Sequence, residues 1–259
     1  MKAAPQFTVI YEDQHIIAVN KAPGISVGGD RWDESRERLD RLVAETVYPN
    51  DGASKIFTIH RIDRETSGLV VFAKDELTHR RLSLAFEGRA VAKRYIAVVH
   101  GRPHWQEIAC DLPLIPNGNK QHKTIIDKYR GKQSLTRFRY LGSAGNYSVL
   151  EALPETGRTH QIRVHAAALG VSIVCDSLYG TDKPGISHAT QHGVMLSAIK
   201  KKWRGDPFEE KPLLSRLGLH AVELDIPADA EITLCALQLK APFPRDMGAL
   251  IRQMNVVIN

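Results

Sequence analysis

Short runs of apolar residues alternate with polar turns along most of this chain, and these runs predict strands. The first two runs, residues 7–11 and 16–19, are separated by four polar residues, which indicates a hairpin. Further strands are predicted at residues 56–59, 69–73, 93–101, 135–141, 147–153, 219–224 and 232–239. Most of the runs are short and bounded by Gly, Pro, Asn or Asp, a pattern typical of an antiparallel sheet.

Apolar residues spaced three or four apart predict four helices between or after these strands. One helix is expected within residues 33–47, and a second begins at the N-cap Asp75 and runs to about residue 87. A third helix is expected from the N-cap Thr159 to Gly170, and the last one carries Met247, Leu250, Ile251 and Met254 on one side. The helices do not alternate regularly with strands, so the sequence predicts an α+β fold with a largely antiparallel sheet. Residues 1–259 contain no linker long enough to require a second domain, and one domain is expected.

The composition is that of an ordinary globular protein with a basic balance. The 259 residues are 43% hydrophobic and 25% charged, and 35 Lys and Arg against 29 Asp and Glu leave a formal charge of +6. This excess favours a polyanionic partner such as a nucleic acid, although basic solvated faces are also common.

The cysteines and the N-terminal sequence suggest a reducing, cytoplasmic setting. Cys110, Cys175 and Cys235 are far apart and form no Cys-x-x-Cys, which argues against a disulfide framework or a zinc knuckle. No apolar leader or long apolar run occurs, so no contact with a membrane is expected. The absence of an exposed heptad pattern makes a monomer the default expectation.

One segment, His60 to Gly68, carries most of the candidate chemistry. It places Asp63 between Arg61 and Arg64 and leads directly into the apolar run 69–73. Two cationic neighbours favour the ionised carboxylate. Such a carboxylate is either part of a structural ion pair or a nucleophile or base.

Two basic segments are candidates for contact with a polyanion. Residues 117–132 carry five cations, Lys120, Lys123, Lys128, Arg130 and Lys132, against the single acid Asp127. This segment is either a solvated hairpin or an arm that contacts phosphates. The second segment, Lys200 to Arg204, surrounds Trp203 with four cations and is either RNA-facing or a solvated loop anchored by the tryptophan.

Several other classes of site lack the residues that they need. His160 and His165 are five residues apart and no His-Glu-x-x-His occurs, so no metal site is expected. The chain has no Walker loop, no Gly-x-Gly-x-x-Gly, no set of protein-kinase motifs and no Gly-x-Ser-x-Gly. The remaining groups, a carboxylate and several arginines on a basic protein, suit covalent carboxylate catalysis on a nucleic acid, or simply binding to one.

Three segments in order resemble motifs of the RluA-type pseudouridine synthases. Residues 60–68 resemble the family's His-Arg-Leu-Asp-x-x-Thr-Ser-Gly signature, with Ile62 in place of Leu. Lys93–Arg94–Tyr95 resembles its Arg-Tyr strand, and residues 156–163 resemble its Gly-Arg-Thr-His-Gln-Ile-Arg helix entry. The resemblance covers roughly residues 8–245. Two departures are a proline, Pro23, one place later than usual and a longer segment at 181–212.

The resemblance implies a pseudouridine synthase fold, with a curved sheet, flanking helices and loops around a central cleft. It also implies isomerisation of uridine to pseudouridine in RNA without a cofactor or metal. Asp63 matches the nucleophile, which attacks either C6 of the uracil or C1′ of the ribose. Tyr95 matches the tyrosine that stacks on the uracil and could help to remove the C5 proton, and Arg163 matches the arginine that pairs with the nucleophile.

The same resemblance suggests where RNA is bound. Arg61 is expected to fill the space left by the extruded base or to contact phosphate. The full set of expected RNA contacts is His60, Arg61, Lys120, Lys123, Lys132, Arg158 and Thr159. Stem-loops of ribosomal RNA and of transfer RNA are both compatible substrates. The alternative function is a non-catalytic RNA-binding protein of the same fold.

Overall fold

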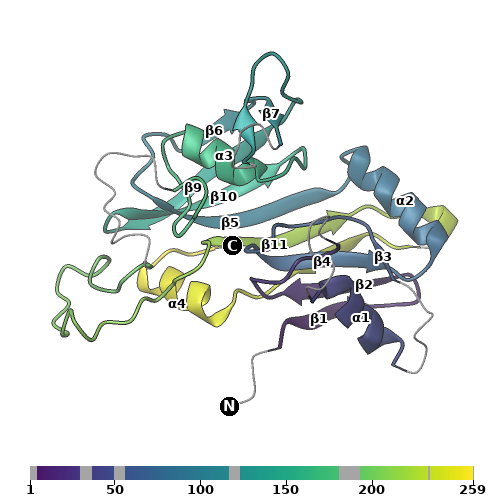
Figure 1. Cartoon of the computed structure of the whole chain (residues 1–259), viewed down its shortest axis with the longest axis horizontal. Helices are drawn as coiled ribbons and strands as arrows, with labels where there is room; N and C mark the ends of the chain where they lie inside the picture. The colour runs from purple at the N-terminus through teal and green to yellow at the C-terminus, as the bar shows by residue number, and fades with distance from the viewer. Residues whose placement is uncertain are drawn as a thin grey trace. The chain divides into compact units, whose positions relative to one another are not determined.

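The computed structural model describes residues 5–29, 37–49, 56–116, 123–180, 193–232 and 234–258. The chain divides into two compact units (Figure 1). Unit 1 contains residues Met1–Lys93 and Ala221–Pro242, and unit 2 contains residues Arg94–His220 and Phe243–Asn259. That residues 1–259 form a single domain remains a prediction.

Unit 1 is built on a sheet with the strand order β1-β2-β4-β11, in which β3 also pairs with β4 and β12 with β11. Its strands are β1 (Phe7–Glu12), β2 (Ile16–Lys21), β3 (Phe57–Thr58), β4 (Ser67–Ala73), β11 (Leu219–Ile226, of which residues 219 and 220 belong to unit 2) and β12 (Leu237–Lys240). The pairs β1–β2, β2–β4, β3–β4 and β11–β12 are antiparallel. The helices are α1 (Leu39–Val47), α2 (Glu76–Glu87) and the short 3-10 helix η2 (Ala230–Ile232).

The apolar pattern of the sequence explains the core of unit 1. All seven residues of β4 are buried, as expected for the uninterrupted run that follows the Asp63 segment. Leu69 and Val71 of β4 pack in one cluster with Leu82 of α2 and Leu224 of β11. The predicted N-cap of α2 is confirmed, because the Asp75 carboxylate accepts the Thr78 N–H at 2.8 Å.

A buried lysine fastens the start of unit 1 to the loop before β4. Lys21 is fully buried, and its Nζ donates to the carbonyl oxygens of Ala22 at 2.8 Å, Ile25 at 2.9 Å and Arg64 at 2.9 Å. The Arg64 carbonyl also accepts the Gly24 N–H at 2.8 Å. A buried ammonium is tolerated only where carbonyls or carboxylates replace water, so these contacts fix the turn after β2 against the loop that holds Asp63.

Unit 2 is built on a second group of paired strands, in the order β5-β10-β9-β6. Its strands are β5 (Ala92–His100, of which residues 92 and 93 belong to unit 1), β6 (Glu107–Cys110), β9 (Thr136–Ala144) and β10 (Tyr147–Pro154), together with the separate hairpin of β7 (Leu114–Ile115) and β8 (Ile125–Ile126). The pairs β5–β10, β9–β10 and β6–β9 are antiparallel. Its helices are α3 (Gln161–Ala168), which lies over β9 and β10 (Figure 1), and α4 (Arg245–Gln253).

The core of unit 2 lies between this sheet and α3. Ala97 and Val99 of β5 face Ile162 and Ala166 of α3 in one buried cluster, together with Phe138 of β9. In α4 the side chains of Met247, Leu250 and Ile251 are buried, which confirms the predicted apolar side of that helix.

The start of α3 differs from the prediction. The N-cap is His160, in the left-handed region with φ of 54°, and Thr159 is exposed. The Gln161 side chain explains the shift, because its Oε1 accepts the Arg158 N–H at 3.1 Å and its Nε2 donates to the Leu135 carbonyl at 3.0 Å. These bonds fasten the first helical residue to the chain next to β9, so the helix begins there.

Some strand predictions also need correction. The strands at 107–110, 114–115 and 125–126 were not predicted, because runs of two to four residues give too little periodicity. The predicted strand at 232–239 is divided into η2, which ends at Ile232, and β12, which begins at Leu237. The predicted helix at 33–47 is confirmed from Leu39 onward, whereas residues 37 and 38 are not helical, and residues 33–36 lie outside the described residues.

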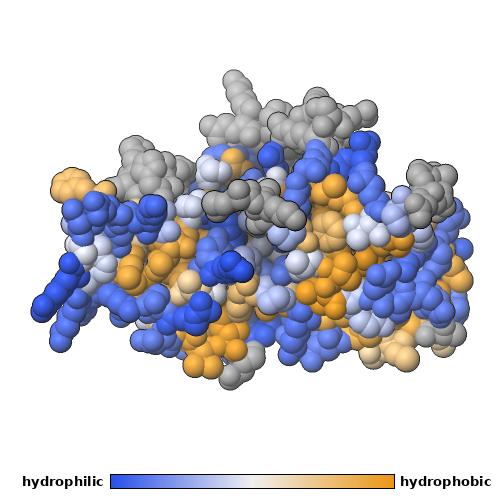
Figure 2. All heavy atoms as spheres, turned by 90° about the horizontal axis from the view of Figure 1, so that it is seen from below, coloured by the Kyte–Doolittle hydropathy of each residue, from blue (hydrophilic) through white to orange (hydrophobic). Residues whose placement is uncertain are grey.

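The surface is mixed in polarity. On the face shown in Figure 2, hydrophobic residues in orange lie between hydrophilic residues in blue. Among the residues that the structure describes, the large apolar side chains with the greatest exposure are Phe208 at 99% and Tyr129 at 98%. Among the described residues, none of the helices has the length and apolar character needed to cross a lipid bilayer.

Glycine is required at position 68 for two reasons, and the two can be separated. Gly68 has φ of +119°, and a Cβ there would lie 2.2 Å from the Ala221 carbonyl oxygen of β11. Gly24 has φ of +94° with open space around it. We expect Gly24→Ala to lower the free energy of unfolding by about 1–2 kcal/mol, the cost of left-handed backbone. Gly68→Ala should cost about 3 kcal/mol or more, because β4 and β11 must also separate.

Urea denaturation of both variants and the unchanged protein measures these differences. Equal losses for Gly24→Ala and Gly68→Ala would show that the close approach of β4 and β11 contributes nothing.

Candidate functional site

Asp63 lies in the loop that connects β3 to β4 in unit 1. The Thr66 N–H donates to the Asp63 carbonyl at 3.1 Å, which closes a turn over residues 63–66. Ile62 on one side and Thr66 and Ser67 on the other are buried, whereas Asp63 is half-buried. The apolar and hydroxyl neighbours therefore anchor the loop and leave the carboxylate at its partly open position.

His60 supports this loop from inside unit 1. Its Nε2 accepts the Val71 N–H of β4 at 3.1 Å, and its ring stacks on Phe86 of α2 with centroids 4.6 Å apart. Burial lowers the pKa of His60 to about 3, and the charge of Lys93 acts in the same direction. The imidazole is therefore neutral at pH 7 and takes the place of a strand carbonyl beyond the end of β3. The expected RNA contact of His60 remains a prediction.

The two arginines beside Asp63 have different surroundings. Arg61 is exposed. Arg64 donates from Nε to the Gly24 carbonyl at 2.8 Å, and its Nε lies 3.7 Å from the Glu65 carboxylate. Arg64 thus takes part in the fastening of the loop to the turn after β2, while Arg61 presents its guanidinium to solvent.

Tyr95 lies near the start of β5 in unit 2. Its backbone is opposite Ala152 of β10, and its half-buried side chain packs against the cluster that contains Ala97 and Ile162. Tyr95 therefore projects from the face of the sheet that α3 covers.

Arg163 of α3 forms a buried, two-pronged ion pair with Asp176. Its Nε and Nη2 each donate to one carboxylate oxygen at 2.8 Å, and both residues are 4% exposed. Burial alone would raise the pKa of Asp176, but the hydrogen bonds and charge of Arg163 lower it, with help from the Leu178 and Tyr179 N–H groups. Sequence reasoning did not identify this partner. The pair holds the guanidinium in one orientation.

Tyr179 completes the surroundings of Arg163. The arginine Cζ lies 5.2 Å from the centroid of the tyrosine ring. The Tyr179 hydroxyl accepts the Thr124 N–H at 3.0 Å and lies 2.9 Å from His160 Nδ1. The tyrosine thereby joins the start of α3 to the segment before β8.

Two polar residues of α3 have structural contacts. Gln161 binds the Thr156 and Thr136 hydroxyls at 2.6 and 2.9 Å. His165 is fully buried between the Thr136 hydroxyl at 3.0 Å and the Leu112 carbonyl at 2.9 Å. Burial lowers the pKa of His165, which favours its neutral form. The motif at residues 156–165 thus combines residues that fix the helix with one arginine, Arg163, that the helix positions.

The other expected RNA contacts are distributed along unit 2. Arg158 is half-buried and donates from Nε to the Gln133 carbonyl at 3.2 Å, and Thr159 follows it with its side chain exposed. Lys123 is half-buried and Lys132 is exposed. Lys120 lies outside the described residues.

The structure groups the candidates within each unit. In unit 1 the loop between β3 and β4 brings together Asp63, Arg61 and His60. In unit 2 the same side of the sheet carries Tyr95 and α3 with Arg163. That the two groups act together remains a prediction.

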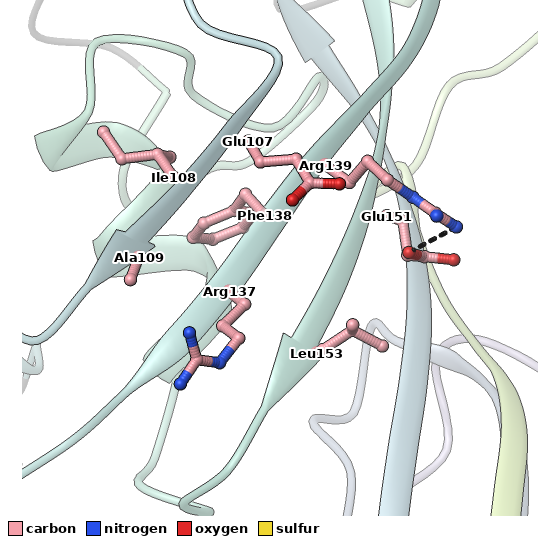
Figure 3. A pocket seen from close by; sticks show the side chains of 8 residues that line it. All are labelled: Glu107, Ile108, Ala109, Arg137, Phe138, Arg139, Glu151 and Leu153. Atoms are coloured by element: carbon pink, nitrogen blue, oxygen red, sulfur yellow. Dashed lines mark ion pairs between the residues drawn. The ribbon is translucent and has the colours of Figure 1, made fainter.

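A pocket on the sheet of unit 2 is separate from these candidates (Figure 3). Its lining consists of Glu107, Ile108, Ala109, Arg137, Phe138, Arg139, Glu151 and Leu153. The Arg139 and Glu151 side chains form an ion pair at 2.9 Å, and Arg137 pairs with Glu155 at 2.9 Å. These arginine charges are compensated within the sheet. Within the part of the chain that the structure describes, no group of three or more His, Cys, Asp or Glu side chains is arranged to hold a metal.

Comparison with known sequences gives a consistent result. The family model described as RNA pseudouridylate synthase matches residues 15–168. Ribosomal large subunit pseudouridine synthase D of Zymomonas mobilis is 35% identical over 252 residues, which are 96% of this chain and 73% of that protein. The dual-specificity RNA pseudouridine synthase RluA of Vibrio cholerae is 38% identical over 68% of this chain and 69% of its own length.

Solved structures show the same fold. Human RNA pseudouridylate synthase domain containing 4 aligns with a TM-score of 0.73 at 21% identity, covering 96% of this chain and 94% of that one. Human RNA pseudouridylate synthase domain containing 1 aligns with a TM-score of 0.66 at 25% identity, covering 94% and 87%.

The neutral state of His60 predicts a dependence of stability on pH. In the unfolded chain a histidine binds a proton near pH 6.5, whereas His60 in the folded protein does so only near pH 3. Because the unfolded state binds the extra proton, the free energy of unfolding should fall as the pH drops from about 6.5 towards 3. This residue contributes up to about 1.4 kcal/mol per pH unit.

Denaturation between pH 7 and about pH 4 measures this slope in His60→Gln and in a control, His104→Gln, whose side chain is exposed. The free energy of unfolding should change less with pH in His60→Gln than in the original protein, whereas His104→Gln should keep the original slope. A slope unchanged from that of the original protein would contradict the neutral, buried role.

Proposed function

This chain belongs to the RNA pseudouridylate synthase family and is an isomerase that acts on RNA, and from this premise we propose that Asp63 is its nucleophile. The observation that supports the assignment is the position of Asp63 in the family signature at residues 60–68. That signature is folded as a loop fastened on both sides to unit 1. A carboxylate on a fixed loop is suited to attack on a bound nucleotide, because its position is set before the substrate binds.

The proposed reaction breaks and remakes one glycosidic bond. Asp63 attacks C6 of the uracil or C1′ of the ribose, the N1–C1′ bond breaks, and the base turns. A bond then forms between C5 and C1′, C5 loses its proton while N1 gains one, and the carboxylate is released. Atoms and electrons balance without an external reagent, so no cofactor or metal is proposed.

Tyr95 and Arg163 are proposed to serve this reaction from unit 2. Tyr95 can stack on the uracil, and its hydroxyl can accept the C5 proton, directly or through water. Arg163 can pair with the nucleophile, and its orientation is fixed by Asp176 at 2.8 Å and by the ring of Tyr179. Because two of its N–H groups are already committed to Asp176, Arg163 would approach Asp63 through its remaining donors.

The RNA would be held by cations around the loop and around α3. We propose phosphate or base contacts for Arg61, His60, Arg158, Thr159, Lys120, Lys123 and Lys132. For Arg61, which is exposed, the proposed role is to fill the space of a base that has turned out of its stack, or to contact phosphate. Turning a base out costs a few kcal/mol and requires compensation.

The substrate that we propose is a uridine in a stem-loop of the large ribosomal subunit RNA or of a transfer RNA. The relative that aligns over 96% of this chain is named for the large ribosomal subunit, and another is named as having dual specificity. We further propose that the protein acts as a monomer in the cytoplasm. Mapping of pseudouridines in total RNA with and without the protein identifies the target, and sedimentation gives the oligomeric state.

Replacement of the nucleophile tests the assignment directly. Asp63→Asn keeps the shape of the side chain and removes its charge, so the variant should fold, bind RNA and lose pseudouridine formation by about three orders of magnitude or more. Pseudouridine formation in bulk cellular RNA is the measurement. Asp225→Asn, an exposed carboxylate on β11, is the matched control and should retain the original rate. Substantial turnover by Asp63→Asn would reject the nucleophile.

Replacement of Arg61 tests the proposed role in base extrusion. Because Arg61 is exposed, Arg61→Ala should leave the free energy of unfolding within about 0.5 kcal/mol. It should raise KM for the RNA about tenfold. Arg80→Ala, at an exposed position of α2, provides the comparison. If Arg61→Ala and Arg80→Ala have the same KM and turnover as the original protein, Arg61 has no part in extrusion.

A further inference from the structure

A loop of unit 2 that takes no part in the proposed chemistry exposes four cations and an aromatic ring. Residues 193–214 leave and rejoin the unit at one place, where the Val194 N–H donates to the Leu214 carbonyl at 2.7 Å and the Leu213 N–H to the Val194 carbonyl at 2.8 Å. Glu210 closes the loop a second time, since it accepts the Ser197 N–H at 2.8 Å and the Ser197 hydroxyl at 2.6 Å. The ends of this loop are therefore fixed.

The loop is also anchored to the turn between β9 and β10. Ile199 is 7% exposed, and a Cβ on Gly145 would lie 2.0 Å from the Ala198 carbonyl oxygen, so the two backbones are in close contact. The Trp203 ring lies against Gly205, where a Cβ would come within 2.4 Å of it. The indole is therefore packed on the backbone of its own turn.

The part of the loop beyond these fixed ends exposes cationic and aromatic side chains. We name residues 200–208 the basic tip. Its four cations, Lys200, Lys201, Lys202 and Arg204, are exposed, and none pairs with a carboxylate among the residues that the structure describes. Phe208 is 99% exposed, and its N–H donates to the Asp206 carboxylate at 2.9 Å. That bond holds the turn from which the ring projects.

We propose that the basic tip is a second RNA-contacting surface, which binds a single-stranded segment of the substrate. The four cations would neutralise phosphates, and the Phe208 ring would stack on an unpaired base. This combination of a positively charged backbone contact with an aromatic platform is what sequence-tolerant binding of single strands requires. The inference rests on the proposed function only in taking the partner to be RNA.

Other partners fit these features less well. A purely electrostatic site for a compact anion would need converging donors, whereas these cations project from one exposed turn. An anionic membrane would attract the same charges, but it would favour several apolar side chains over a single ring. Binding to lipid is therefore an alternative outcome of the experiment below.

The experiment measures the affinity of the full chain for labelled single-stranded oligouridine over a range of salt concentrations. Lys200→Gln/Lys201→Gln/Lys202→Gln should weaken binding about tenfold or more at low salt. It should also reduce the slope of log K against log salt by about 0.7 for each phosphate that is no longer neutralised. The matched control, Arg41→Gln/Arg80→Gln/Arg252→Gln, removes three exposed charges elsewhere and should have a smaller effect on both quantities.

A second pair of variants tests the aromatic contact. Phe208→Leu should weaken binding about fivefold or more, and Phe208→Trp should retain it, because only an aromatic ring stacks on a base. Equal affinity of Phe208→Leu and the original protein would reject the stacking contact.

The basic tip would be rejected if the lysine variant and the control lose affinity equally, or if the lysine variant binds like the original protein. It would also be rejected if binding to phosphatidylglycerol vesicles, and not to oligouridine, depended on the three lysines. Because affinity is the readout, Asp63→Asn in parallel separates this inference from the catalytic assignment. If Asp63→Asn forms no pseudouridine but its affinity for oligouridine still depends on the basic tip, the inference holds.

Discussion

The buried ammonium of Lys21 is the constraint on which the geometry of unit 1 depends. A charge removed from water must be matched by hydrogen-bond acceptors, and the three carbonyls that accept from Nζ belong to two separated segments. Arg64 supplies one of them, directly after Asp63. The proposed nucleophile is therefore held at one end by a lysine 42 positions earlier in the sequence and at the other by the strand that follows it.

Asp63 and Asp176 have different surroundings. Both oxygens of Asp176 accept from Arg163, and Oδ1 also accepts two backbone N–H groups, so this carboxylate is committed to structure. Asp63 is half-buried, whereas its neighbours Ile62, Thr66 and Ser67 are buried. Asp176 holds the guanidinium of Arg163 in one orientation.

The sequence predicted the elements whose apolar period is long and uninterrupted. The hairpin of β1 and β2, the run of β4, and α2 with its cap at Asp75 all follow from local patterns. The Arg163–Asp176 pair was not predicted because no period relates the two positions, and the ion pair exists only once the loop folds back on α3. The propensity of threonine favours Thr159 as the N-cap, but the side-chain bonds of Gln161 to residues near β9 override that propensity. The role of His60 was likewise hidden, because the backbone N–H that it satisfies is 11 residues later.

The hydrogen bond from Val71 to the imidazole of His60 restricts the number of residues between β3 and His60. β3 contains only two residues, which pair with Ala73 and Phe72 of β4. The next residue of β4, Val71, donates its N–H to the His60 ring and not to a backbone carbonyl of β3. A side chain can replace a backbone acceptor in this way only if it lies a fixed number of residues after the end of the strand. Adding or deleting one residue between Thr58 and His60 would turn the ring away from Val71 and expose an unsatisfied amide. In this chain the connection from Thr58 to His60 is therefore restricted in its number of residues as well as in their identity.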